Sequence, residues 1–411
     1  MDSILLPKVI ANLPWSEARL LLQTKYDLSI DETAELFCAK YMHDSRLWTR
    51  GTEEQKIILT QNRGTIYEKQ PPYRLVCLPF YKFWNYNEPL SAVQTVGTAQ
   101  WTYYTEKLDG SFFKLYYFNK EWHISSNSRI DIKQFREKYV HCGKTNEQLW
   151  QEAATEANLD YSKLNQQYAY FFERVHPEYK IVIKYEKPML YHLGTRDMST
   201  LEELEIDIGV RKPRVIPFST FDECLEYVNR MRFAEGEGIV ACDLKTYDRI
   251  KIKSPSYLLV HYQTVGMENK NKQSQFCLNI WLQGEKQEYL TYFPQYTDKY
   301  NQIEQQIEQV IIIDLISDFS RIYSSEDKIF FTNLNKDHVS MGKPDLDRKR
   351  QILIMIFQQN KNCDWNSLTN EEKFMAVRNI LRHRNMINNR KFTFEKALRS
   401  LIKQSENEIH S

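Results

Sequence analysis

The last quarter of the chain is short of glycine and proline. From Asn301 onward there is one glycine, Gly342, and one proline, Pro344, whereas the other 11 glycines and 12 prolines lie before it. These residues form turns and interrupt helices. Their scarcity therefore argues against a turn-rich sheet domain in the last quarter and predicts helices there, with most strands in the earlier part.

Long apolar runs and paired cysteines are also missing. The apolar run Val310 to Ile313 ends at Asp314, and even the longest run, the six residues Ile352 to Phe357, is too short to span a bilayer. An odd, scattered set of cysteines without a C-x-x-C pair or a zinc pattern predicts reduced thiols in an intracellular, cytoplasmic protein. The N-terminus, with Asp2 and Pro7, lacks the basic-then-apolar leader of a signal peptide. We expect a soluble protein with no membrane partner. The seven cysteines are at positions 38, 77, 142, 224, 242, 277 and 363.

Net charge is close to zero but unevenly distributed. The 411 residues carry a net charge of +1 and are 42% hydrophobic, a balance typical of a globular protein with two or three domains. Residues 373–403 contain nine Lys or Arg and one acid, Glu395, a net charge of +8, so the remainder carries −7. A basic helical patch fits contact with RNA phosphates. Ordinary solvated helix faces are the alternative.

Alternating and β-branched runs predict a first domain of strands with two inserted helices. Capping boxes open the helices at Thr145 and Thr220, to about 159 and 232, and another capping box pairs Thr369 with Glu372. Strand-rich sequence with few helices predicts an α+β domain on antiparallel sheets. We place the domains at 1–262 and 263–411, the second mostly helical. The predicted strands are 75–78, 101–105, 112–118, 169–173, 179–183, 238–241 and 249–253, and the predicted tail helices cover about 303–315, 346–360, 369–385 and 393–405.

Lys107 is the strongest candidate for a reactive side chain. It ends a predicted strand, and Asp109-Gly110 then forms a tight turn into the next strand, which predicts a β-hairpin with the lysine at its tip. A lysine amine is a covalent nucleophile only when it is deprotonated and held in position. A surface hairpin with a solvated lysine is the alternative.

Four further segments carry groups suited to a nucleotide. The Arg63-Gly64 pair at a strand edge could aim a guanidinium at phosphate or ribose oxygens, and Lys82, beside two aromatic residues, could bind phosphate near a base. Glu173 ends an apolar strand, where a ribose would give the carboxylate a partner. Glu237 enters an apolar strand after two glycines and could hold a hydrated Mg²⁺. Each segment alone also fits a surface position.

The fourth segment is Lys251-Ile252-Lys253, with Tyr257 beyond it. In a strand, residues i and i+2 share a face, so both ammonium groups would point the same way. Two cations on one face fit an α-phosphate and its developing charge. A solvated strand edge is the alternative reading.

Together these segments resemble the covalent nucleotidyltransferase superfamily, and within it the bacteriophage-type RNA ligase 1 family. The resemblance covers roughly residues 60 to 260. It implies a nucleotidyltransferase domain with ATP-grasp-like antiparallel sheets and flanking helices, followed by an all-α domain. The matching motifs are Lys107-Leu108-Asp109-Gly110-Ser111, Phe172-Glu173-Arg174-Val175-His176-Pro177, Glu237-Gly238-Ile239-Val240 and Lys251-Ile252-Lys253-Ser254, with Arg63-Gly64 and the Lys82 to Glu88 stretch upstream.

The resemblance implies an ATP-dependent RNA ligase that uses Mg²⁺ or Mn²⁺ and joins RNA 5′-phosphate and 3′-hydroxyl ends in RNA repair. Lys107 would take AMP from ATP, and Tyr257 would act in the later joining. Broken tRNA is one candidate substrate, and a monomer is expected. The implied nucleotide-binding residues are Tyr41, Arg63, Lys82, Glu173, Lys251 and Lys253, and the implied metal ligands are Glu237 and, in the second domain, Glu288, with Glu285 beside it.

One departure from the family pattern concerns positive charge shortly after the motif of Lys107. Family members often have basic residues there, whereas residues 122–127 offer only His123. Three other functions stay open: a capping guanylyltransferase or DNA ligase, a fungal-type tRNA ligase domain that requires a 2′-phosphate, and an inactive RNA-binding relative. The helical tail argues against the first, because those enzymes usually carry a β-barrel after the last motif.

Overall fold

The computed structural model describes most of the first 310 residues and one later helix. The described residues are 4–43, 45–88, 99–134, 143–179, 181–262, 267, 273–310, 316, 317, 320 and 365–385. The helices predicted at 346–360 and 393–405, and much of the basic segment 373–403, lie outside these residues. No described helix is long and apolar enough to cross a membrane.

The chain divides into two compact units. The first contains residues 1–15 and 30–264, and the second contains residues 16–29 and 265–411. The second unit thus includes a short N-terminal segment as well as the C-terminal part of the chain. We had predicted domains at 1–262 and 263–411, which differ from these units mainly at residues 16–29.

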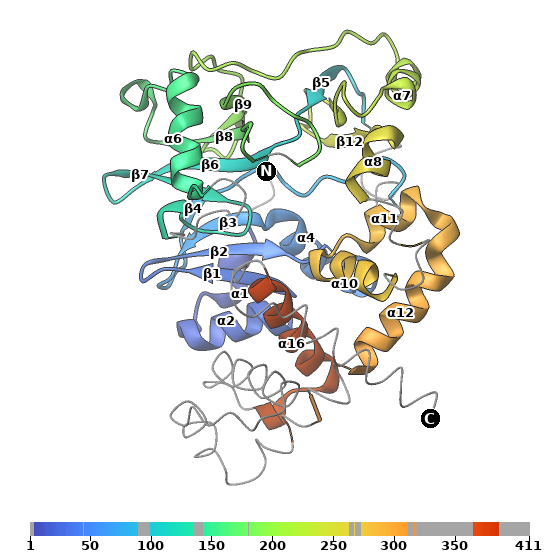
Figure 1. The fold of residues 1–411 in the computed structure, drawn as a ribbon. Coiled ribbons are helices and arrows are strands. Elements are labelled where there is room, and N and C mark those ends of the chain that lie inside the picture. The colour runs from blue at the N-terminus through green and yellow to red at the C-terminus, as the bar shows by residue number, and fades with distance from the viewer. Residues whose placement is uncertain are drawn as a thin grey trace. The chain divides into compact units, whose positions relative to one another are not determined.

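Three sheets make up the first unit (Figure 1). The pairings among β2 to β12 are antiparallel, as predicted for an α+β fold. The four-stranded sheet has the order β1-β2-β3-β4, from Leu28–Glu32, Leu36–Tyr41, Arg63–Glu68 and Leu75–Cys77. The five-stranded sheet has the order β10-β9-β8-β6-β7, from Glu203–Leu204, Met189–Asp197, Tyr168–Val175, Ser111–Phe118 and Glu121–Ser126. The three-stranded sheet has the order β12-β11-β5, from Arg249–Lys253, Gly238–Cys242 and Tyr103–Lys107.

Alternation along β8 explains how the five-stranded sheet is covered. Tyr170 and Phe172 face the core beneath α6, whereas Ala169 and Phe171 face the core shared with the four-stranded sheet. Figure 1 shows α6, Asn146–Glu156, lying across this sheet. Helix α7, Phe221–Arg230, packs on the three-stranded sheet through Cys224 and Val228. The capping box at Thr145 and the N-cap at Thr220 are confirmed.

The remaining elements of the first unit are short, except α4. That helix opens with a capping box between Thr52 and Gln55, which the sequence analysis did not use. These elements are α1 Leu6–Ile10, α3 Leu47–Arg50, α4 Glu53–Gln61, η1 Ile132–Gln134, η2 Tyr161–Lys163 and α8 Pro255–Tyr262.

Apart from Leu28 and Ser29 at the start of β1, the regular elements in the described part of the second unit are helices. The predicted cap of Thr369 on α16 is confirmed by reciprocal bonds with Glu372. Arg378, on the same helix, is buried and pairs with Asp27 at 2.6 Å, so this member of the basic segment already has an acidic partner. The elements are α2 Trp15–Thr24, which begins one residue before the unit, α10 Gln273–Gln283, α11 Lys286–Tyr292, η3 Pro294–Tyr296, α12 Thr297–Val310, η5 Trp365–Ser367 and α16 Asn370–Asn385.

Two expectations about strands are wrong. The strands on either side of Asp109-Gly110 do not pair as a hairpin, because β5 pairs with β11 and β6 pairs with β7 and β8. Residues 181–183 form bends instead of a strand, because two of their backbone N–H groups donate to the Asp109 carboxylate. Six of the described strands were not predicted, namely β1, β2, β3, β7, β9 and β10.

Candidate active site

Lys107 lies where the chain crosses from the three-stranded to the five-stranded sheet. It is the last residue of β5, and β6 begins at Ser111 in the other sheet. The crossing segment is held by Asp109, which is almost fully buried. Its carboxylate accepts the N–H groups of Val182 and Ile183 at 2.8 and 2.7 Å. The lysine therefore stands on a fixed backbone between two sheets, not at the tip of a hairpin.

Two tyrosines complete the support of Asp109. The hydroxyl of Tyr257, on α8, donates to Asp109 Oδ1 at 2.7 Å. The hydroxyl of Tyr185 accepts the Asp109 N–H at 3.0 Å. Tyr257 is only 2% exposed, so its observed place is behind the Lys107 segment. A role for Tyr257 in RNA joining stays a prediction.

Strand register brings the predicted charged groups together. Gly238 of β11 is opposite Lys107 of β5 on one side and Lys253 of β12 on the other. Glu237 comes immediately before Gly238 in the sequence and is 4% exposed. Its two oxygens lie 2.6 Å from Lys107 Nζ and 3.3 Å from Lys253 Nζ. One buried carboxylate therefore holds two ammonium groups.

Gly238 is required for this arrangement. Its φ of +154° is a conformation that residues with a side chain rarely adopt. A Cβ at this position would lie 2.0 Å from the Ile252 carbonyl oxygen and 2.8 Å from Lys253 Cα. The Glu-Gly pair thus lets β11 and β12 approach closely where the charged groups converge.

A cavity of about 350 Å³, here called the Lys107 cavity, opens beside these groups. Apolar side chains of both sheets line it, including Leu193 of β9 and Val240 of β11. Leu193 lies where the β8–β9 register shifts, and such a bulge re-aims a side chain. The predicted residues that line the cavity are Arg63, Lys107, Glu173, Lys251 and Lys253.

Glu173 is the acid on the five-stranded side of the cavity. It is opposite Phe112 on β6, which brings it close to the crossing segment. Burial raises the pKa of Glu173 to about 7, while the positive charge of Lys107 opposes the rise and Glu237 adds to it. Near neutral pH this carboxyl group is thus close to half-protonated, and a bound cation or hydroxyl donor would favour its ionised form.

Positive charge also gathers in the lining of the Lys107 cavity. The Arg63 guanidinium lies over the rings of Phe83 and Phe112, with centroid distances of 5.1 and 4.7 Å. Lys251 lies over Phe83 at 5.2 Å, and the strand carrying it bonds to the backbone of Trp84. Burial and several of these cations lower the pKa of His43 well below its ordinary value.

Lys82 and Tyr41 occupy a neighbouring aromatic cluster. Lys82 is 6% exposed, and its ammonium lies 4.1 Å from the Trp84 ring centroid and 5.1 Å from that of Tyr41. Neither residue is part of the lining of the Lys107 cavity. Their predicted nucleotide contacts stay predictions, as does a metal role for Glu288, which lies on α11 of the second unit.

Lys114 is a residue that the sequence analysis missed. It is fully buried on β6, and its ammonium donates to the carbonyl oxygen of Gly64, next to Arg63. No carboxylate pairs with it in the described part of the chain. Its position in the apolar run of β6, two residues after Phe112, is the signal that would have found it.

Lys114 is thus a second basic candidate shortly after the Lys107 motif, in addition to His123, although it does not line the Lys107 cavity. The His123 ring stacks on Tyr116 and contacts the Phe118 carbonyl oxygen at 3.1 Å, and it does not line the cavity. The two lysines, Lys107 and Lys114, lie seven residues apart on consecutive strands.

Another acidic cluster lies away from the cavity. Glu152 and Glu178 flank His176, but Lys144 already lies 2.8 and 2.6 Å from the two carboxylates. His176 Nδ1 accepts the Glu178 N–H, and its Nε2 contacts Glu152 at 3.0 Å. These contacts fasten α6 to the end of β8, with Lys144 paired to both carboxylates.

Comparison with known proteins gives the class of this site. Residues 61–257 match a family model described as RNA ligase, that of the phage T4 RNA ligase 1 type. The matched segment contains Lys107, Glu173, Glu237 and both lysines of β12. The resemblance to the RNA ligase 1 family is thereby confirmed over these residues.

Two viral proteins are similar in sequence. A bifunctional polynucleotide kinase/RNA ligase, so named, of Autographa californica nuclear polyhedrosis virus is 27% identical over 254 residues, which cover 58% of this chain and 35% of that protein. An RNA ligase of Rhodothermus phage RM378 is 29% identical over 175 residues, 36% of this chain and 40% of that protein. The chain thus spans only about two fifths or less of the length of these relatives.

The solved structures with some similarity include RNA ligases and a protein described as an ATP-dependent DNA ligase of Aquifex aeolicus. An archaeal ATP-dependent RNA ligase aligns with a TM-score of 0.43 and 10% identity, over 74% of this chain and 78% of that one. A Naegleria gruberi RNA ligase with ATP and Mn aligns with a TM-score of 0.32 and 16% identity, over 42% and 55%. These scores are too low to support an argument about function.

Proposed function

We propose that this chain is an ATP-dependent RNA ligase with a nucleotidyltransferase fold, and that Lys107 is its nucleophile. The observation that carries the proposal is the row Lys107–Glu237–Lys253 at the edge of the Lys107 cavity. A half-buried lysine held between two sheets, with a carboxylate 2.6 Å from its amine, suits covalent catalysis. The family match over residues 61–257 supports the same function.

The cavity offers places for each part of ATP. Leu193 and Val240 supply apolar surface for the base, and Glu173 is the acceptor for a ribose hydroxyl. Arg63 and the lysines of β12 supply positive charge for the phosphates. The cavity volume of about 350 Å³ lies in the range of small-ligand sites.

In the first step, the Lys107 amine attacks the α-phosphorus and pyrophosphate leaves. The amine must lose a proton, and Glu237 is the carboxylate positioned to accept it. Lys251 and Lys253 stabilise the charge that develops on the phosphate. AMP then passes to an RNA 5′-phosphate, and a 3′-hydroxyl attacks the activated end as AMP leaves.

Mg²⁺ or Mn²⁺ fits the proposal through Glu237. Its buried carboxylate is a hard oxygen donor, and its two oxygens pair with the ammonium groups of Lys107 and Lys253. The ion would neutralise the phosphate charges. Glu237 is the first proposed ligand, and Glu288 is kept as a proposal from the family pattern.

Incubation with α-labelled ATP tests the function directly. We expect covalent label that is stable in alkali and lost in acid, as a phosphorus–nitrogen bond requires, with equimolar pyrophosphate. Lys107→Ala and Lys107→Arg should remove it, whereas Lys120→Ala, at a surface turn, should not. No label on the wild-type chain, or label on Lys107→Ala, would exclude the assignment.

The RNA substrate needs a second assay. A 5′-phosphorylated oligoribonucleotide with a plain 3′-hydroxyl should be circularised or joined, and a nicked anticodon loop tests the proposal that broken tRNA is the substrate. A requirement for a 2′-phosphate would favour the fungal-type alternative. Labelling by GTP in preference to ATP would favour a capping enzyme. Sedimentation tests the proposed monomer.

A further inference from the structure

A second cavity lies on the other side of the wall formed by Phe83, Tyr247 and Arg249. It has a volume of about 620 Å³ and is here called the Tyr81 cavity. The three wall residues line both cavities, so a ligand in the second would be next to a nucleotide in the first. None of the residues predicted from the motifs, except Lys82, lines it.

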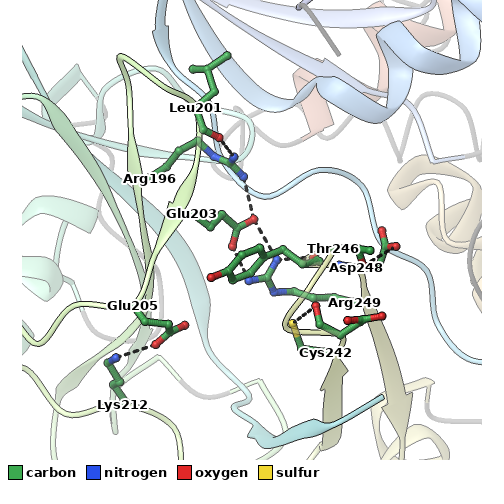
Figure 2. A network of polar contacts seen from close by, with 11 residues as sticks. Arg196, Leu201, Glu203, Glu205, Lys212, Cys242, Thr246, Asp248 and Arg249 are labelled. Carbon is green, nitrogen blue, oxygen red and sulfur yellow. Dashed lines mark hydrogen bonds and ion pairs between the residues drawn. The ribbon is translucent and has the colours of Figure 1, made fainter. Parts of the chain in front are cut away.

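The wall of the Tyr81 cavity contains a network of two guanidinium groups and one carboxylate. Figure 2 shows Glu203 between Arg196 and Arg249. Glu203 Oε1 accepts from Arg196 at 2.8 Å and from Arg249 at 3.1 Å, and Oε2 accepts from Arg249 at 2.5 Å. The three side chains together carry a net charge of +1. One positive charge at the cavity wall is therefore not matched by Glu203.

Arg196 is the arginine of this network that keeps a buried N–H group without a hydrogen-bond acceptor in the described part of the chain. It is 4% exposed, and within the described part of the chain its Nε–H has no hydrogen-bond partner. Its Nη1 donates to the Leu201 carbonyl oxygen, and its guanidinium lies 5.6 Å from the Tyr81 ring centroid. A buried donor without an acceptor is costly unless a ligand supplies one.

Aromatic rings accompany these cations. Tyr81 is 37% exposed at the cavity, a high value for so large a ring. Tyr247 has a φ of +58°, an uncommon conformation for a bulky residue, and strained residues of this kind gather at binding sites. Its backbone carbonyl oxygen accepts from Arg249 at 2.9 Å, which holds the strained turn against the network.

We propose that the Tyr81 cavity binds an unpaired nucleotide of the RNA substrate, with its base on the Tyr81 or Tyr247 ring and its phosphate toward Arg196 and Lys245. Aromatic rings beside arginine and lysine are the usual combination for single-stranded RNA, since every base has a stacking face and every phosphate a charge. The inference rests on the proposed RNA ligase function and adds to it a place for the RNA strand.

The test measures RNA binding and self-adenylylation separately on the full chain. A short, unstructured, 5′-phosphorylated oligoribonucleotide with a 3′ fluorophore is titrated without ATP, and anisotropy is recorded. Tyr81→Ala should weaken binding by about 5- to 100-fold, the range for loss of one stacked base, and Tyr81→Phe should keep most of it. Lys245→Ala should reduce the slope of log binding constant against log salt concentration by about the value for one phosphate contact.

Tyr227→Ala is the matched control, because Tyr227 is 40% exposed on α7 and does not line the cavity. It should bind RNA as the wild type does. Self-adenylylation of Tyr81→Ala should stay within about twofold of the wild-type rate, a change too small to indicate a role in ATP binding.

Three results would overturn the inference. The first is that Tyr81→Ala binds the oligoribonucleotide as tightly as the wild type does. The second is that Tyr81→Ala loses RNA binding and self-adenylylation to the same extent. The third is that ATP by itself displaces the bound oligoribonucleotide from the wild-type chain. A wild-type chain that takes no label from ATP would instead overturn the ligase function itself. A wild-type chain that takes label but binds no RNA would overturn the Tyr81 cavity proposal.

Discussion

Two places in the first unit have the same charge pattern and different chemistry. Lys107–Glu237–Lys253 and Arg196–Glu203–Arg249 each put one carboxylate between two cations, and β12 contributes to both, through Lys253 at one end and Arg249 at the other. The first has two single-point ion pairs. In the second, Arg249 donates to both oxygens of Glu203, and each arginine also donates to a backbone carbonyl oxygen. This second network joins the five-stranded sheet to the three-stranded sheet.

The cation type explains the difference. A lysine ammonium is a point charge on a flexible stem and exchanges partners easily, whereas the planar arginine fork binds a carboxylate with two oxygens and holds its geometry. The lysine pattern therefore suits a site that must release its carboxylate when substrate arrives. The arginine pattern suits a permanent connection between β10 and β12.

Removal of the Glu203 charge should have the largest effect. Glu203→Gln leaves two largely buried guanidinium groups without a carboxylate, which we expect to lower the free energy of unfolding by about 3–5 kcal/mol. Denaturant titration measures the loss. Glu202→Gln, at the exposed neighbouring position, should be close to wild type. A loss of stability as small as that control would show that the network is not the connection we infer.

Removal of the Glu237 charge should affect catalysis more than folding. Glu237→Gln should slow lysyl-AMP formation by about 100-fold or more, the usual cost of losing a proton acceptor, or about 2.7 kcal/mol in barrier. Its unfolding free energy should fall by less than that of Glu203→Gln, because Lys107, whose side chain is 20% exposed, can turn toward the cavity when its partner is lost. Single-turnover labelling and denaturant titration measure the two quantities.

Glu235→Gln is the control for this variant, since Glu235 lies two residues away and pairs with exposed Arg232. It should label at the wild-type rate. If Glu237→Gln lost several kcal/mol of stability and kept its labelling rate, the contrast between the lysine and arginine patterns would be wrong.

Lys114 adds to these two networks a buried cation that has no carboxylate partner in the described part of the chain. Its charge lies beneath the Arg63 segment, so Lys114→Met should raise the KM for ATP in labelling by about tenfold, or about 1.4 kcal/mol, with little change in the maximal rate. Stability should not fall, because a buried charge is replaced by an apolar side chain of similar length. Initial rates against ATP concentration and thermal unfolding check this.

Tyr116→Phe is the matched control for Lys114→Met. Tyr116 is equally buried on the same face of β6, and the substitution removes only its bond to the Ile130 carbonyl oxygen. It should leave the KM for ATP unchanged. An unchanged KM for Lys114→Met as well would assign Lys114 to folding alone.

Local signals in the sequence were sufficient for much of the fold. The caps at Thr145, Thr220 and Thr369 act through hydrogen bonds within one helical turn. The order of neighbouring residues is therefore enough to predict them. Strands β6, β8, β11 and β12 were found because burial on a pleated sheet imposes alternation. The hairpin at Asp109-Gly110 was wrong, because pairing partners depend on distant strands that local pattern cannot specify.

The sequence by itself determined which residue types were available for chemistry: a lysine before Asp-Gly, acids that end or enter apolar strands, and two lysines on one strand face. Tertiary structure decided which of them meet. Register brings Lys107, Glu237 and Lys253 together, a distant pair of tyrosines and two backbone N–H groups fix Asp109, and the fold places Lys114 against the Gly64 carbonyl oxygen, next to Arg63. The physical reason is that a charge acquires a role only from the partners and the solvent exclusion around it, and both come from segments far apart in the chain.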